Sequence, residues 1–363
     1  MSQVLSYPEI LERIDAVDPL AYRKTRNHIT GAVSRLSPYI TRGVVTLPHI
    51  RERIYARYSP RQAETFIKQL AWREYFQAVW WACGEDIFND LRFSRTDWHH
   101  RHLVSAVVAA QTGIDEIDHA ITEWYASGTM HNHARLWVAA LACNLVKSHW
   151  YPMSRWLYYH LADGDLASNM LSWQWVAGTL VNKRYDMNQA LINACGRFEQ
   201  RNTFLEINRE DLHTLPVPAH LMDSEPAIFP TRLPPGDPVA SVAGQRVMLY
   251  HPWHLSPTWR STDSPQRRIL VIEPSHFQRF PVSEAVMTFI VHQARALLPD
   301  IEVFVGDLNQ LPGLTAAAAP VTRTYPAVHT WPVIHDPPER LFPAVTGYYP
   351  SFSKYWQQVN KPS

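Results

Sequence analysis

The sequence is poor in cysteine and in long apolar runs. It has three cysteines among 363 residues, Cys83, Cys143 and Cys195, and no C-x-x-C pair. This argues against a disulfide framework, a cysteine-ligated zinc site and a four-cysteine iron–sulfur cluster. The longest apolar stretch, residues 136–146, is far shorter than the roughly 20 residues that a membrane span needs, and the polar N-terminus has no signal-peptide core. We therefore expect a soluble, cytoplasmic protein that makes no membrane contact.

The chain also lacks a charge excess and a nucleotide fingerprint. There are 34 Lys and Arg residues against 33 Asp and Glu, which excludes an overall basic protein but not a local basic groove. Neither a P-loop nor a G-x-G-x-x-G motif occurs. What the sequence has in quantity is tryptophan, with 14 residues, and proline, with 28.

Proline divides the chain into two parts. Six prolines precede residue 210 and 22 follow it, so one architecture does not fit both parts. In the first part apolar residues recur at helical spacing, which predicts helices over 4–17, 61–81, 117–125, 130–147 and 153–161.

The second part reads differently. After a Pro-rich stretch, β-branched runs predict strands at 247–250, 269–272 and 301–305, with a helix over 283–298 before the last strand. We predict a mainly α protein: a helical domain (1–213), a Pro-rich linker (214–244) and a small α/β unit (245–363). The sequence assigns no role to this C-terminal unit.

The first segment with candidate binding residues is Ser34-Arg35-Leu36-Ser37, followed by Pro38. Hydroxyls, a guanidinium and the unpaired N–H groups of a helix start suit a diphosphate. An ordinary helix N-cap is the alternative.

The second segment lies in the helix predicted over 61–81. There Gln69, Trp72 and Arg73 share one face, and an amide, an aromatic ring and a guanidinium together suit a stacked heterocycle. A buried tryptophan beside an Arg–Glu pair is the alternative.

The third segment gathers polar side chains and rings within a few turns, at His131, Asn132, His133, Arg135, Asp163, Asp165, Asn169, Trp173 and Trp175. Neither aspartate is followed by a histidine four residues later, so we expect no metal. A solvated acidic loop is the alternative.

Taken in order, four stretches resemble the FAD-binding catalytic domain of DNA photolyases and cryptochromes: SRLSPYITRG (34–43), QLAWREYF (69–76), MHNHARLWVAAL (130–141) and DGDLASNMLSWQW (163–175). The resemblance covers about residues 5–200. It implies a helical fold and FAD as the cofactor. Family members carry an antenna domain ahead of this domain, so the resemblance implies a short member without it.

The resemblance also implies roles for single residues. The Asp163–Arg135 pair would lie along the flavin ring, Asp165 at its polar edge and Asn169 opposite its N5 atom. The residues assigned to FAD are Tyr22, Ser34, Arg35, Leu36, Ser37, Gln69, Arg73, Arg135, Asp163, Asp165 and Asn169. Those assigned to electron transfer are Trp173, Trp150 and, by the weakest match, Trp98. Those assigned to the substrate pocket and catalysis are Asn169, Trp72, Trp175, Asn132, His133 and Gln69.

The implied function is light-driven repair of pyrimidine dimers in UV-damaged DNA by a monomer. The alternative is a blue-light receptor with FAD as chromophore, in which the C-terminal unit contacts a protein partner. The lesion stays open: Gln69 is typical of (6-4) enzymes, whereas Asn132 stands where those enzymes have a catalytic histidine. For DNA contacts the sequence offers a run of arginines after the first motif, at Arg42, Arg51, Arg53, Arg57 and Arg61, with a solvated helix face as the alternative.

Overall fold

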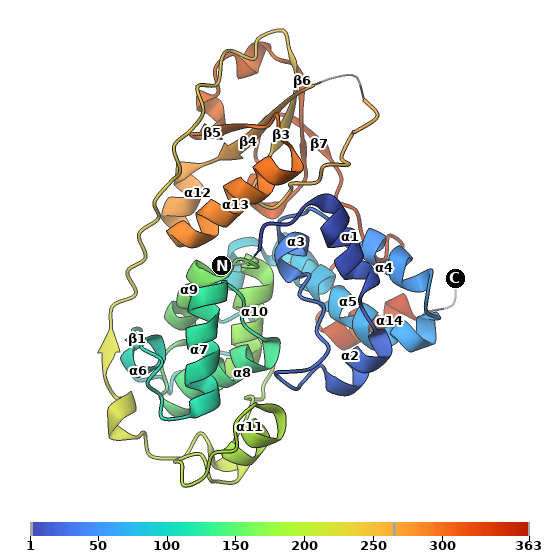
Figure 1. Ribbon diagram of the computed structural model, residues 1–363. Helices are drawn as coiled ribbons and strands as arrows, with labels where there is room; N and C mark the ends of the chain where they lie inside the picture. Colours follow the sequence, from blue (N-terminus) through green and yellow to red (C-terminus); the bar gives the residue numbers. More distant parts are fainter. Residues whose placement is uncertain (1–2, 264–265, 362–363) are drawn as a thin grey trace. The chain divides into compact units, whose positions relative to one another are not determined.

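The computed structural model describes residues 3–263 and 266–361 and consists of two compact units (Figure 1). The helical unit comprises Asp18–Val33, Arg61–Ile228 and Thr346–Ser363. The α/β unit comprises Met1–Val17, Ser34–Pro60 and Phe229–Val345. The mainly α fold class with a small α/β unit is confirmed. The two units interleave along the chain, so their limits differ from the continuous domains predicted at 1–213 and 245–363.

The helical unit contains the elements that carry most of the candidate site. Its helices are α2 (Pro19–Thr25), α5 (Pro60–Cys83), α6 (Ser105–Val108), α7 (Asp115–Ser127), α8 (Asn132–Ala140), α9 (Trp150–His160), α10 (Leu166–Ala177), α11 (Gln189–Cys195) and α14 (Phe352–Val359). A short antiparallel pair joins β1 (Leu103–Val104) to β2 (Ser224–Glu225). The predicted helices are confirmed, although a π-helical turn (Leu141–Leu145) ends the one expected over 130–147.

Helix α10 is capped at both ends, by Asp165 and by Gly178. The Asp165 side chain accepts a hydrogen bond from the Ser168 N–H (2.7 Å), an N-cap worth about 1 kcal/mol. Gly178 ends the helix in the left-handed conformation, with φ of 84°. Between these caps nearly every residue is buried, because α8 and α9 pack against it (Figure 1).

The α/β unit is built on a parallel sheet in the order β5-β4-β3-β6-β7. Its strands are β3 (Arg246–Tyr250), β4 (Arg267–Ile272), β5 (Glu302–Val305), β6 (Ala318–Arg323) and β7 (Ile334–Asp336). Its helices are α1 (Tyr7–Asp15), α3 (Ser37–Thr41), α4 (Leu47–Tyr55), α12 (Pro274–Arg279) and α13 (Glu284–Leu297). The predicted strands β3, β4 and β5 and the helix α13 are confirmed.

Strand β6 was not predicted, and its composition explains why. Pro320 lies in the middle of the strand and has no N–H for the ladder. The chain accommodates it with an irregularity in the register opposite Arg246–Met248, next to Ala319, which has a φ of 53°. A proline and a bulge together hide the period-2 pattern by which a strand is recognised.

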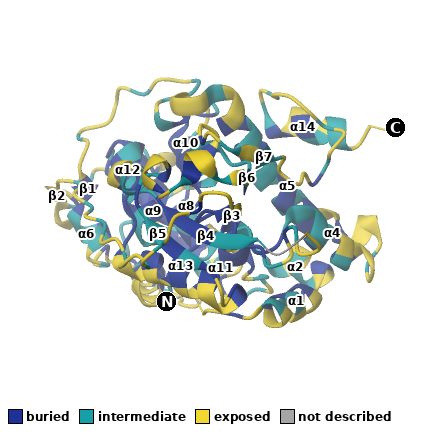
Figure 2. Cartoon of the chain, turned by 90° about the horizontal axis from the view of Figure 1, so that it is seen from above, coloured by how far each residue is buried: buried dark blue, intermediate teal, exposed yellow. Residues whose placement is uncertain are grey.

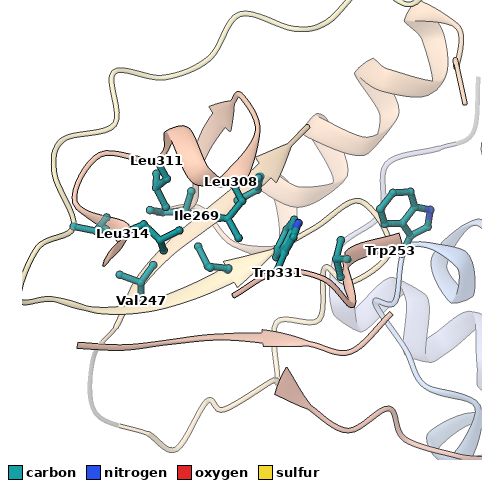
Figure 3. Close-up of a cluster of buried hydrophobic side chains, with 11 residues drawn as sticks. Val247, Trp253, Ile269, Leu308, Leu311, Leu314 and Trp331 are labelled. Atoms are coloured by element: carbon teal, nitrogen blue, oxygen red, sulfur yellow. The ribbon is translucent and has the colours of Figure 1, made fainter. Parts of the chain in front are cut away.

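The centre of this unit is a cluster of aliphatic and aromatic side chains against β3 and β4 (Figure 3). Both strands are buried along most of their length (Figure 2), as expected for a parallel sheet. The N-terminal segment joins the unit through the Gln293 amide of α13, which both accepts from the Leu5 N–H (3.1 Å) and donates to the Leu5 carbonyl (2.7 Å). Tyr39 adds an edge-to-face contact with Phe289.

Across residues 3–263 and 266–361, no helix combines the length and the apolarity needed to cross a bilayer.

Candidate functional site

The acidic loop between α9 and α10 is fixed to α8 by a buried ion pair. Arg135 Nη2 lies 2.8 and 3.0 Å from the two carboxylate oxygens of Asp163, while its Nε donates to the Met130 carbonyl (2.9 Å). The Asp163 side chain is 4% exposed and that of Arg135 23%. Gly164 fits because a Cβ there would lie 3.0 Å from the Leu161 carbonyl oxygen. The loop is therefore tightly placed, and a solvated acidic loop is ruled out.

The second carboxylate of the loop faces α5. Asp165 Oδ2 lies 3.2 Å from Arg73 Nη2 and also accepts a hydrogen bond from the Gln77 amide. The Asp165 side chain is 1% exposed, so its charge depends on these donors. Gln77 was missed in the sequence analysis, although it lies one turn after Arg73 on the same face. Gln69, one turn before Arg73, is half-buried.

Asn169 lies on the first turn of α10 and is 8% exposed. Its Nδ2 donates to the Ser154 carbonyl of α9 (2.8 Å). This bond fixes the orientation of the amide, so its oxygen is the end available to accept a hydrogen bond from a ligand. Beside it, the Ser168 hydroxyl is buried without a hydrogen-bond partner, an arrangement that costs about 1–3 kcal/mol unless a ligand or water satisfies it.

Two of the three tryptophans assigned to electron transfer are connected by a ring that the sequence analysis missed. His149 stacks on Trp150, with ring centroids 5.7 Å apart, and meets Trp98 edge to face at 5.6 Å. Burial lowers the pKa of His149 to about 4, so this imidazole is neutral near pH 7. The Trp150 indole N–H donates to Asp90 (2.7 Å). The only hint in the sequence is the adjacency of His149 and Trp150.

The exposure of these tryptophans falls from the surface inward. Trp98 is 36% exposed, with the Arg101 guanidinium 5.0 Å from its ring, whereas Trp150 and Trp173 are each 2% exposed. Trp173 lies on α10, which packs against α9. A path that starts at the solvent and ends in the interior suits electron supply from outside.

The histidine assigned to catalysis is engaged at both ring nitrogens. His133 Nδ1 lies 2.7 Å from the Asn27 carbonyl, to which it must donate, and Nε2 lies 3.1 Å from the Tyr185 hydroxyl. Burial lowers its pKa, which agrees with a neutral ring that accepts from Tyr185. The Tyr185 ring lies 5.7 Å from that of Trp175. His133 thus supports Tyr185 beside Trp175, while Asn132 is exposed at the start of α8.

Trp72, assigned to the substrate pocket, is covered on one face. The Phe352 ring of α14 stacks on it with centroids 3.7 Å apart and planes 9° apart. Trp72 directly precedes Arg73 on α5, so this stack lies next to the residue that binds Asp165.

The residues assigned to the diphosphate, Tyr22 and the turn at 34–37, belong to different units. In the helical unit, Tyr22 is half-buried against Phe66, and burial raises the pKa of its hydroxyl. In the α/β unit, Arg35 is exposed with a left-handed φ of 52°, whereas Leu36 is fully buried. The Leu36 side chain is therefore core, and only its backbone suits a ligand. Ser34 Oγ accepts from the Leu36 N–H (3.4 Å), and Ser37 is exposed at the start of the short α3.

The arginine run expected to offer a basic patch is largely engaged inside its own unit. Arg42 is buried and donates to the Pro252 carbonyl (3.2 Å). Arg51 donates to the Leu341 carbonyl, Arg53 to the Asp15 carboxylate and Arg57 to the Ile14 carbonyl. Burial removes Arg42 from any surface patch, whereas Arg51 and Arg53 are half-buried and Arg57 is exposed, so the basic patch stays a prediction. Arg61 is exposed.

A comparison with known protein families matches the part of the sequence that contains most of these site residues. The family model described as the FAD-binding domain of DNA photolyase matches residues 66–217. Over these residues the chain is similar to that FAD-binding domain. The matched range contains both buried Asp–Arg pairs, Asn169 and the three tryptophans assigned to electron transfer, Trp98, Trp150 and Trp173.

Curated relatives align with this chain at 28–30% identity. The deoxyribodipyrimidine photo-lyase of Streptomyces griseus is 30% identical over 190 residues, 52% of this chain and 42% of the relative. A cryptochrome DASH of Gloeobacter violaceus is 28% identical over 170 residues, 44% of this chain and 33% of the relative. The chain thus spans less than half the length of these curated relatives. Among solved structures, a Synechocystis cryptochrome aligns with a TM-score of 0.48 at 24% identity, covering 53% of this chain and 44% of that one.

The residues present in the FAD-binding domain fit a flavin. An isoalloxazine ring offers N–H donors, carbonyl acceptors and a large apolar face. Around the acidic loop the protein offers the guanidiniums of Arg135 and Arg73, the fixed oxygen of Asn169 and the unsatisfied hydroxyl of Ser168. This combination of donors and an acceptor complements the carbonyls and N–H groups of such a ring.

Proposed function

We propose that this protein is a light-driven DNA repair enzyme of photolyase type that splits UV-induced pyrimidine dimers. One observation carries the proposal: the two buried carboxylates Asp163 and Asp165, each paired with an arginine, next to the oriented amide of Asn169. Buried charges of this kind are costly, and a bound cofactor accounts for their presence.

In this proposal the chain's own residues bind and orient. Arg135, Asp163, Asp165 and Asn169 of the helical unit hold the flavin ring. When bound and reduced, FAD would supply light-driven one-electron chemistry to the dimer, with the electron returned once the dimer has split. The aromatic walls Trp72 and Trp175 receive the dimer of two adjacent pyrimidines after it has turned out of the DNA helix, a step that costs least for a damaged and poorly stacked site.

The tryptophans have a separate task. Trp98, His149 and Trp150 form a continuous series of rings from the surface inward, and the resemblance assigns Trp173 on α10 to the same task. These residues pass electrons from an external reductant toward the cofactor when it is oxidised. Asp90 accepts the indole N–H of Trp150 (2.7 Å), so its carboxylate stabilises positive charge on that ring.

The decisive experiment is repair by the purified, chemically reduced holoprotein. UV-irradiated oligothymidylate is illuminated with blue light, and cyclobutane dimers and (6-4) photoproducts are quantified separately by chromatography. We expect one photoproduct to disappear under light and neither to change in the dark. If neither declines under light although FAD is bound and reduced, the repair function is wrong.

The second candidate is a blue-light receptor without repair activity, and the covered face of Trp72 favours it. A receptor predicts light-dependent chemistry of the bound cofactor with no loss of either photoproduct. The same illumination experiment therefore separates the two functions.

A further inference from the structure

The last segment of the chain returns to the helical unit after the α/β sheet is complete. Residues 229–345 belong to the α/β unit, but Thr346–Ser363 belongs to the helical unit. Within this segment α14 lies along α5 (Figure 1). Gly347, just before it, has a φ of 85°, and a Cβ there would meet no atom within 4 Å. A left-handed glycine in open space suits a hinge.

Helix α14 places an aromatic ring where a base would stack. Phe352 is only 6% exposed and covers Trp72 in a nearly parallel stack at 3.7 Å. This is the face-to-face geometry by which aromatic side chains hold an unpaired base. Phe352 also contacts Tyr75 edge to face at 5.8 Å.

Side-chain contacts hold the helix in this position. The Tyr355 hydroxyl donates to Glu74 (2.7 Å), and the Tyr355 ring packs on that of Tyr75. The ammonium of Lys68 lies 5.5 Å from the Trp356 ring centroid. All three partners, Lys68, Glu74 and Tyr75, lie on α5, so α14 is anchored to the helix that carries Trp72 and Arg73.

A helix as short as α14 can be displaced from α5. Eight residues are too few for a helix that is stable by itself in water, so α14 exists because of its contacts with α5. A ligand that stacks on Trp72 competes with Phe352 for the same surface. When α14 is bound to α5, the face of Trp72 is covered. When α14 is released, this face is open.

We propose that α14 is an intramolecular plug, in which Phe352 occupies the stacking position of a lesion base on Trp72 and must leave before damaged DNA binds. This inference rests on the proposed function, because it takes Trp72 as a wall of the lesion pocket. The plug lowers the apparent affinity by the fraction of molecules in which Trp72 is open. It also keeps the aromatic wall away from other planar ligands.

The test compares variants of the full holoprotein by fluorescence anisotropy with a dye-labelled UV-irradiated oligothymidylate. We expect Phe352→Ala to bind about tenfold more tightly than the wild type. Tyr355→Phe, which loses the hydrogen bond to Glu74 but keeps the ring, should have a smaller effect of the same sign. Gln357→Ala, at an exposed position of α14, is the matched control and should leave the affinity unchanged.

A second measurement follows the plug itself. Hydrogen exchange at 346–361 is measured in the wild type with and without the irradiated oligonucleotide, and unirradiated DNA serves as the control. We expect the amides of α14 to lose protection when damaged DNA binds. Unchanged protection with DNA bound, or equal or weaker affinity for Phe352→Ala, overturns the plug.

The outcomes distinguish this inference from the proposed function. Repair by a wild type whose affinity is unaffected by Phe352→Ala overturns the plug and leaves the repair function standing. Tighter binding by Phe352→Ala without repair under light supports the plug and overturns the repair function. If neither protein prefers irradiated DNA, both are wrong.

Discussion

In the helical unit three carboxylates are buried, Glu116, Asp163 and Asp165, and each lies against an arginine. The described residues of the α/β unit bury no carboxylate; the centre of that unit is aliphatic and aromatic. A sheet core can be filled by apolar side chains alone, whereas buried charges need partners. The contrast indicates that the interior of the helical unit serves more than packing.

Within the helical unit the three carboxylates also differ from one another. Glu116 accepts hydrogen bonds from the backbone N–H groups of Arg197 and Phe198 and lies 3.5 Å from the Arg197 guanidinium. A Cβ at Gly196 would approach its Oε2 to 2.7 Å, so the turn is built around this carboxylate. Glu116 is explained by the fold alone. Asp163 and Asp165 lie in the loop that precedes Ser168 and Asn169, where a ligand explains them better.

The largest expected effect comes from Asp163→Ala. Removing this carboxylate leaves Arg135 without its charged partner, which costs about 3 kcal/mol of stability, and most of the FAD should be lost. Urea unfolding gives the stability, and the ratio of flavin to protein absorbance gives the cofactor content.

Glu116→Ala is the matched control for that variant. It removes an equally buried carboxylate from Arg197 and should destabilise the protein by a similar amount, yet each folded molecule should keep its FAD. A fully yellow Asp163→Ala protein would contradict the assignment of Asp163 to the flavin.

The second-largest expected effect comes from a substitution in the apolar core of the α/β unit. Ile269 is fully buried in the cluster on β4, and Ile269→Ala should cost about 3 kcal/mol through the cavity it leaves. The FAD content of the protein that remains folded should be unchanged. Flavin loss in proportion to destabilisation would show that the core of the α/β unit also supports cofactor binding.

A third prediction compares tryptophans that are buried alike. Trp173→Phe in the helical unit should slow light-driven reduction of bound FAD at least tenfold, about 1.4 kcal/mol in activation free energy. Trp253→Phe, equally large and 6% exposed in the α/β unit, should leave this rate unchanged. Absorbance under steady blue light measures it. An unaffected Trp173→Phe rate would mean that electrons travel by another route.

The smallest expected effect is a change in the stability of the protein at acidic pH. Burial among the rings of Trp124, Tyr125 and Tyr159 lowers the pKa of His160 to about 4, while the unfolded chain titrates near 6.5. As pH falls from 6.5 to 4 the unfolded state takes up the proton first, so stability falls over this window. Because the ring is partly exposed, we expect about 1 kcal/mol from this residue. In His160→Gln the decline between pH 7 and pH 4.5 should be shallower by that amount; an identical decline would place the acid sensitivity elsewhere.

Helix periodicity and motif order carried most of what could be predicted from the sequence. The helices α5, α7 and α9 follow from the spacing of apolar residues, and Arg135, Asp163 and Asn169 from the resemblance, with the ion pair then observed at 2.8 Å. All the roles assigned to single residues, including those of Gln69, Asn132 and the turn at 34–37, stay predictions.

What could not be predicted depends on contacts between distant segments. Gln77 and His149 carry no motif of their own and matter only because Asp165 and Trp98 are folded against them. The stacking of Phe352 on Trp72 joins residues 280 positions apart, beyond any local pattern. The arginines at 42–57 read as a basic run, but their carbonyl and carboxylate partners are supplied by other segments.

The interleaving of the two units constrains how the polypeptide acquires its structure during synthesis. The backbone of Leu5 forms hydrogen bonds with Gln293, which is synthesised 288 residues later. In the same way, α5 packs against α14, which is synthesised long after it. Nascent chains emerge N-terminus first, and long sequence separations slow the approach to the native state. The earliest segments therefore leave the ribosome well before their partners exist, and their apolar surface stays exposed until those partners follow.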